Sequence, residues 1–141
     1  NRKIEQSVWE PRFSVGNHMS DKHHQKLLEL CEEVRLCLQD AHTAGNQHVQ
    51  VMLENLCSYA QEHFREEERL LAQHNYPDLT EHQAEHNEYM LQLRRFLTEA
   101  TNGTFDKEGL QPYLTEWWSR HILVSDMRFS KFLALRPPLW L

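Results

Sequence analysis

The stretch from His63 to His86, HFREEERLLAQHNYPDLTEHQAEH, predicts a helical hairpin with polar side chains on its facing surfaces. His63 and Glu67 are four residues apart, as are His82 and His86. Residues four apart share one face of an α-helix, so each pair projects to a single side. The segment 75–78, NYPD, has the composition of a turn. We therefore expect two antiparallel helices that bring the two pairs together.

The hairpin belongs to a larger helical pattern. Apolar residues recur at three- to four-residue spacing in four segments, 20–41, 47–73, 80–101 and 110–135. Thr80, with Gln83 three residues later, matches a capping box for the third helix, and Pro112 fits the first turn of the fourth. Short links favour antiparallel neighbours. The fold expected is all-α: one domain over residues 1–141, built as an antiparallel up-down-up-down four-helix bundle.

The ends of the chain lie outside this pattern. Residues 1–19 contain Trp9 and Phe13 but show no helical period. We expect them to form an extended N-terminal arm whose aromatic side chains cover the core. Residues 136–141 are expected to form a short tail, because Pro137 and Pro138 end the fourth helix.

Composition excludes several classes of protein. The 141 residues include 15 Lys and Arg against 21 Asp and Glu, a formal net charge of −6, so nucleic acid is not an expected partner. No apolar run is long enough to span a membrane, and the first residues lack the apolar stretch of a secretory signal. A cytoplasmic location is expected. Three cysteines, an odd number without CxxC spacing, are expected to be reduced core thiols.

The polar pairs extend to the other two helices. If the chain reverses near Gly45, His24 lies level with residues 63–67, and further reversals place His121 and Asp126 at the same height. His121 and Asp126 are five apart, which leaves them roughly 140° from a shared face in a regular α-helix. We predict a π-bulge between them. All four helices then contribute to one site.

The residues of this site suit two metal ions. Five imidazoles and two carboxylates exceed the four ligands of a structural zinc site, and the set contains no thiolate. Carboxylates can bridge two ions, and converging acids and imidazoles would be costly to bury without a metal. The predicted ligands of a non-haem di-iron centre are His24, His63, Glu67, His82, His86, His121 and Asp126.

From Trp9 to about Phe132, the sequence resembles the hemerythrin family, particularly the bacterial hemerythrins. The resemblance is carried by five motifs: residues 13–16 (FSVG) in the entry arm, 21–24 (DKHH), 63–68 (HFREEE), Tyr76-Pro77 with His82 and His86, and 117–122 (WWSRHI) with Asp126.

The resemblance implies a role for each ligand. His82, His86 and His121 would hold a saturated iron, and His24 and His63 a five-coordinate one. Glu67 and Asp126 would bridge the two irons together with an oxo or hydroxo group. Dioxygen would bind reversibly at the five-coordinate iron, in an apolar pocket.

The expected pocket wall is formed by Leu27, Phe64, Trp118 and Ile122. Trp118 departs from the family pattern, which usually has Leu at this position. The larger indole would either fill the space beside the five-coordinate iron or turn away from it. Two other departures are His23, in place of a usual Gln, and Phe129, in place of a common Tyr.

The expected function is oxygen binding for transport, storage or sensing, rather than catalysis. Two alternatives remain open at this level: a di-iron peroxidase or nitric oxide scavenger, and a regulatory module within a longer protein. The partners expected are dioxygen and either a fused signalling domain or further copies of the chain.

Overall fold

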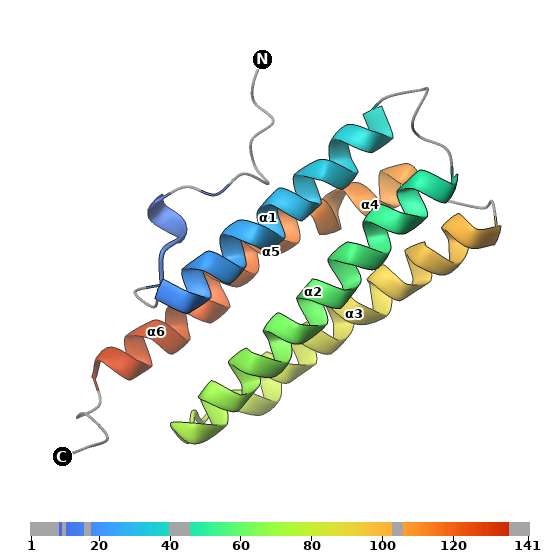
Figure 1. The fold of residues 1–141 in the computed structure, drawn as a ribbon. Coiled ribbons are helices and arrows are strands. Elements are labelled where there is room, and N and C mark those ends of the chain that lie inside the picture. The colour runs from blue at the N-terminus through green and yellow to red at the C-terminus, as the bar shows by residue number, and fades with distance from the viewer. Residues whose placement is uncertain (1–8, 10, 16–17, 40–45, 103–105, 136–141) are drawn as a thin grey trace.

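The computed structural model describes residues 9, 11–15, 18–39, 46–102 and 106–135. Three long helices form three legs of a bundle: α1 (His18–Gln39), α2 (Asn46–Gln73) and α3 (Leu79–Asn102). The fourth leg is divided into α4 (Lys107–Leu114), α5 (Glu116–Arg120), the π-helix η3 (His121–Asp126) and α6 (Met127–Ala134). Figure 1 shows α2 running beside α3, and α1 lying along the fourth leg. The all-α, antiparallel four-helix bundle predicted from the sequence is confirmed.

The turn between α2 and α3 follows from one left-handed residue. Asn75 has φ of 54°, a conformation that asparagine tolerates better than most residues. The Tyr76 amide then donates to Leu71 O at 3.0 Å, and the Asn75 amide to Ala72 O at 3.1 Å, which is the Schellman pattern of helix ends. Tyr76 also packs with Leu71 and Phe129 in a small apolar cluster. This turn sets the register in which α2 meets α3.

The predicted capping box at Thr80 is wrong. Helix α3 begins at Leu79, and the His82 amide donates to Asp78 O at 3.0 Å, so Thr80 already lies within the helix. The side-chain amide of Gln83 does not reach back to the start of the helix. Its Nε2 atom donates instead to Glu68 Oε1 at 3.4 Å, because Gln83 faces α2.

The fourth leg also begins earlier than predicted. Asp106 caps α4 by accepting a hydrogen bond from the Gly109 amide at 3.0 Å, which places Pro112 in the second turn and not the first. Proline lacks the amide hydrogen that an interior helical position donates. Thr115 then departs from helical geometry, with φ of −122° and ψ of −64°, and separates α4 from α5. The predicted single helix over 110–135 is therefore segmented.

The described residues 11–15 pack on the bundle. Residues Pro11–Phe13 form a short 3₁₀ turn (η2), and the buried Phe13 belongs to the main core. The Val15 amide and the Ser14 hydroxyl both donate to the Asp21 carboxylate, at 2.9 and 2.6 Å. Helix α1 starts at His18, before the predicted residue 20.

Several predicted features lie outside the described residues: most of the N-terminal arm, the end of the first helix at 40–41, the breaks at Gly45 and Gly103, and the tail 136–141. Within the described ranges, none of the helices is long and apolar enough to cross a membrane.

Candidate metal centre

The structure brings the seven predicted ligand side chains into one buried cluster in the middle of the bundle. Their exposed fractions range from 0% for His24 to 6% for Glu67. Helix α1 supplies His24, α2 supplies His63 and Glu67, α3 supplies His82 and His86, and the fourth leg supplies the remaining two. Each of the four legs therefore contributes at the same height.

The two carboxylates lie between two groups of imidazoles. Asp126 directs Oδ1 to His82 Nε2 at 3.1 Å and Oδ2 to His24 Nε2 at 3.1 Å. Glu67 directs Oε1 to the Nε2 atoms of His82 and His86, both at 3.0 Å, while its Oε2 lies 3.8 Å from His63 Nε2. Each carboxylate thus has one oxygen toward a three-histidine half and the other toward a two-histidine half.

The three-histidine half consists of His82, His86 and His121. Its ring centroids are 4.8–4.9 Å apart. His86 Nε2 and His121 Nε2 are 3.2 Å apart, and His121 Nε2 is 3.2 Å from Asp126 Oδ1. One ligand atom from each histidine and from Glu67 falls within 4.8 Å of all the others, so these groups could hold one metal ion.

The two-histidine half has fewer donors and more unsatisfied atoms. His24, His63 and Glu67 could hold a second ion by the same criterion. His24 Nε2, His63 Nε2 and Asp126 Oδ2, which faces His24, are buried without a well-aligned hydrogen-bond partner. Asp126 Oδ1, which faces His82 of the other half, is likewise without one. Buried polar atoms rarely remain without partners, and a cation in each half would satisfy all four. The residues present therefore fit a pair of metal ions.

The π-helix makes the contribution of the fourth leg possible. In η3 the Met127 amide donates to Ile122 O, a bond to the fifth preceding residue. The wider turns bring His121 and Asp126, five residues apart, close to one face. The predicted π-bulge between these residues is confirmed.

Three further side chains orient the imidazoles of the cluster. His86 Nδ1 lies 2.7 Å from Glu68 Oε2, and His121 Nδ1 lies 2.8 Å from Glu85 Oε1. Metal-binding histidines commonly donate their second nitrogen to a carboxylate in this way, which fixes the tautomer and the ring plane. On the two-histidine half, His63 Nδ1 lies 3.1 Å from His23 Nδ1 instead, so an imidazole replaces the carboxylate.

In the absence of a metal, the cluster holds opposite charges close together. Burial opposes protonation of His82, but the Asp126 and Glu67 carboxylates outweigh it and raise the pKa of His82 to about 9. Burial lowers the pKa of His63 to about 3, which keeps this imidazole neutral. The pKa of Glu67 lies well below its ordinary value, since hydrogen bonds from three histidines exceed the opposing effect of burial. A cation bound here would take the place of the histidine protons.

The four residues of the predicted pocket wall are all buried, with exposed fractions of 3% or less: Leu27, Phe64, Trp118 and Ile122. The Trp118 ring is stacked on Phe64, with centroids 5.5 Å apart, and lies 6.4 Å from His24 and 6.3 Å from His63. The indole does not turn away from the two-histidine half. It packs against it.

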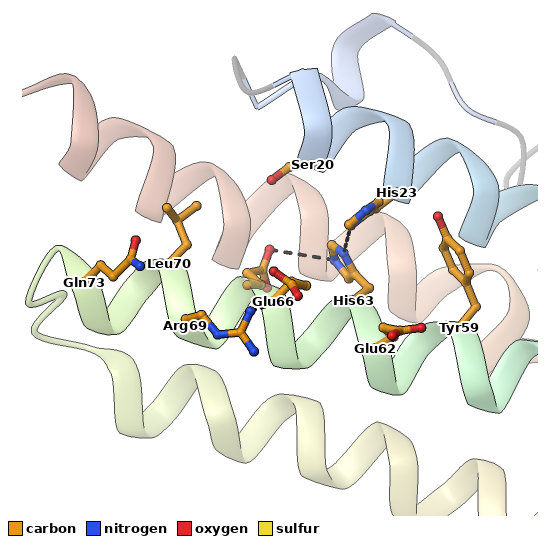
Figure 2. A pocket seen from close by; sticks show the side chains of 10 residues that line it. Ser20, His23, Tyr59, Glu62, His63, Glu66, Arg69, Leu70 and Gln73 are labelled. Atoms are coloured by element: carbon orange, nitrogen blue, oxygen red, sulfur yellow. Dashed lines mark hydrogen bonds and ion pairs between the residues drawn. The ribbon is translucent and has the colours of Figure 1, made fainter.

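A cleft of about 550 Å³ between α1 and α2 also reaches this half. Figure 2 shows His23 and Ser20 on α1 facing a row of α2 side chains that begins at Tyr59. The buried ligands His63 and Glu67 form part of its wall. The two-histidine half thus borders both the apolar wall and a cleft whose lining residues are mostly polar or charged.

A comparison with known protein families decides the classification. The model of the hemerythrin HHE cation binding domain matches residues 15–133. The chain belongs to the hemerythrin family. Membership of this family implies a di-iron site, and the histidine and carboxylate cluster is a group that could bind metal.

Several curated hemerythrins are similar to this chain. It is 26% identical over 125 residues to a bacteriohemerythrin of Clostridium acetobutylicum, which covers 86% of this chain and 97% of that protein. It is 27% identical over 125 residues to a hemerythrin-like protein of Naegleria gruberi, with 89% and 92% covered. It is 26% identical over 123 residues to myohemerythrin-1 of Phascolopsis gouldii, with 87% and 91% covered. No solved structure matches significantly.

Sequence reasoning missed the residues that support the cluster. It did not single out Glu68 or Glu85, although each adjoins a predicted ligand in the chain, at Glu67 and His86. A search for acids at the height of the ligand histidines would have found both, since such histidines need a second partner. It also missed Tyr89, whose hydroxyl accepts a hydrogen bond from Trp118. A single sequence contains no signal for that contact.

Proposed function

We propose that this hemerythrin binds dioxygen reversibly at a di-iron centre held by His24, His63, Glu67, His82, His86, His121 and Asp126. The observation that supports this most directly is the placement of the carboxylates. Asp126 lies 3.1 Å from a histidine of each half, through a different oxygen in each case. Such a placement suits two ions that share the carboxylate, and a single ion would leave one oxygen unused.

The ligand roles in this proposal are unequal. His82, His86 and His121 would give one iron three imidazoles, with the carboxylates of Glu67 and Asp126 beside them. His24 and His63 would give the other iron only two imidazoles, which would leave room for an exogenous ligand. Bound iron, with a bridging oxo or hydroxo group, would supply the redox chemistry that reversible oxygen binding requires.

The residues around the centre support reversible binding over catalytic turnover. Leu27, Phe64, Trp118 and Ile122 exclude water from one side of the two-histidine half. Glu68 and Glu85 hold His86 and His121 in fixed orientations, so the donor atoms are positioned before the metal arrives. Transport, storage and sensing of dioxygen all use this chemistry. A cytoplasmic location remains a prediction.

The test is metal analysis combined with optical spectra of the reduced protein under argon and under oxygen. We expect two iron ions per chain, new visible bands under oxygen, and reversal of these bands on deoxygenation. Asp126→Ala should lower the iron content below two, whereas Glu54→Ala, at an exposed position on α2, should retain both ions. One metal ion per chain, or zinc alone in the purified protein, would refute the di-iron centre. Irreversible oxidation without an oxygenated form would refute the binding function and favour the peroxidase alternative.

A further inference from the structure

The cleft between α1 and α2, whose lining residues are mostly polar or charged, is the feature that oxygen binding leaves unexplained. An apolar ligand has no need of charged groups along its approach, yet about 550 Å³ of cleft adjoins the buried His63 and Glu67. At the apolar wall, Trp118 is 0% exposed and packs against Phe64. The cleft therefore offers the two-histidine half a connection to solvent that the apolar wall does not.

The charge of the cleft favours cations. Its wall includes the carboxylates of Glu62, Glu66 and Glu67, and one cationic group, the guanidinium of Arg69. Arg69 Nη1 is paired with Glu66 Oε2 at 2.9 Å. The remaining charge is negative, and a concave surface of one sign concentrates ions of the opposite sign.

Metal-binding atoms continue along the cleft toward the cluster. Glu62 and Glu66 lie exposed on α2. His23, half-buried on α1, lies 3.1 Å from His63 through the Nδ1 atoms (Figure 2). His63 is 2% exposed, and its Nε2 atom has no hydrogen-bond partner. Exposed carboxylates, the His23 imidazole and the buried His63 thus border one cleft that reaches the cluster, and they offer donors to a cation that is losing its water shell.

We propose that this cleft is the route by which hydrated ferrous ions enter and leave the centre. The inference rests on the proposed function, because the route leads to the same metal ions. It assigns Glu62 to attraction of the cation, and His23 to its transfer toward His63. The apolar side then remains closed to ions, which Trp118 and Phe64 would exclude.

The test is exchange of bound iron for isotopically labelled ferrous iron in the fully loaded, reduced protein under argon, followed by mass spectrometry. A cleft carboxylate stabilises the cation during passage, so its removal slows entry and exit alike. Glu62→Gln should slow exchange about two- to fivefold, and Glu62→Lys about tenfold or more. Added salt should slow the wild type more than Glu62→Lys, since screening weakens the attraction.

Glu54 provides the matched control, because it is an exposed glutamate on the same helix that does not line the cleft. Glu54→Lys should leave the exchange rate within about twofold of wild type. Equal rates in Glu62→Lys and wild type, or equal slowing in Glu54→Lys and Glu62→Lys, would overturn the route. A wild-type protein that holds no iron pair would instead refute the proposed function, so the two failures are distinguishable.

Discussion

Trp118 Nε1 donates a 2.7 Å hydrogen bond to the hydroxyl of Tyr89, and both side chains are 0% exposed. The bond joins the fourth leg to α3 and holds the indole against Phe64 and the two-histidine half. A tryptophan in this position can therefore act as a fixed wall, because the hydroxyl of Tyr89 satisfies its only polar atom.

Tyr89→Phe should loosen this wall. The substitution removes the acceptor and leaves the indole N–H buried without a partner, which costs about 1–3 kcal/mol of folding free energy. Urea unfolding followed by tryptophan fluorescence measures the loss. Tyr113→Phe, at a half-buried position on α4, should change stability by about 0.5 kcal/mol or less. Equal effects of the two substitutions would show that the Trp118 bond contributes nothing specific.

Trp118→Leu should open space beside the two-histidine half. We expect faster association of dioxygen with the reduced protein, measured by stopped-flow absorbance, and a loss of about 2–4 kcal/mol of stability from the cavity. Trp117→Leu is the control, because Trp117 stacks on His121 of the other half, with centroids 4.6 Å apart. An unchanged association rate in Trp118→Leu would mean that the indole does not limit access.

Glu68→Gln should weaken metal retention without removing a ligand. His86 Nδ1 lies 2.7 Å from Glu68 Oε2. An amide oxygen in place of this carboxylate is a weaker hydrogen-bond acceptor. Loss of such a partner lowers metal affinity by about 10- to 100-fold. Competition with a ferrous chelator measures this, and Glu54→Gln should match wild type. Wild-type affinity in Glu68→Gln would show that the contact does not tune the site.

Cys31 should destabilise the protein at alkaline pH. Burial raises the pKa of its thiol from 9.0 to about 12, so the folded state keeps the proton that the unfolded chain loses. This contribution to stability is fully present below pH 9 and is lost as the pH rises from 9 toward 12. At pH 10 the loss is roughly 1 kcal/mol.

Urea unfolding of the wild type and Cys31→Ala at pH 7.5 and pH 10 measures this effect. The substitution lowers stability at both pH values because it leaves a cavity. The loss of unfolding free energy between pH 7.5 and pH 10 should, however, be smaller in Cys31→Ala than in the wild type. A pH dependence identical to that of the wild type would contradict the assignment to Cys31.

Local rules of the sequence predicted much of the fold. Apolar spacing located the long helices within a few residues, since the stripe that must be buried defines each helix. The boundaries that failed, at Thr80 and Pro112, depend on side-chain contacts between helices and on backbone caps such as Asp106. Those contacts lie beyond the range of local spacing.

The sequence by itself determined that these residues would converge. The four-residue spacing of His63 with Glu67 and of His82 with His86 follows the helical period, and short links fix the height of the helices. The five-residue spacing of His121 and Asp126 even required the π-helix that the structure contains. Periodicity is a property of the backbone, so one chain is enough to predict it.

Tertiary structure alone decided how the cluster is surrounded. Side-chain packing between legs decides which carboxylate meets which imidazole and in which direction the Trp118 indole turns. It also forms the cleft beside His63. Rotamers are chosen by neighbours that are distant in the chain, and no sequence spacing encodes them. The orientation of the Trp118 indole thus depends on a hydrogen bond to Tyr89, a residue 29 positions away in the chain.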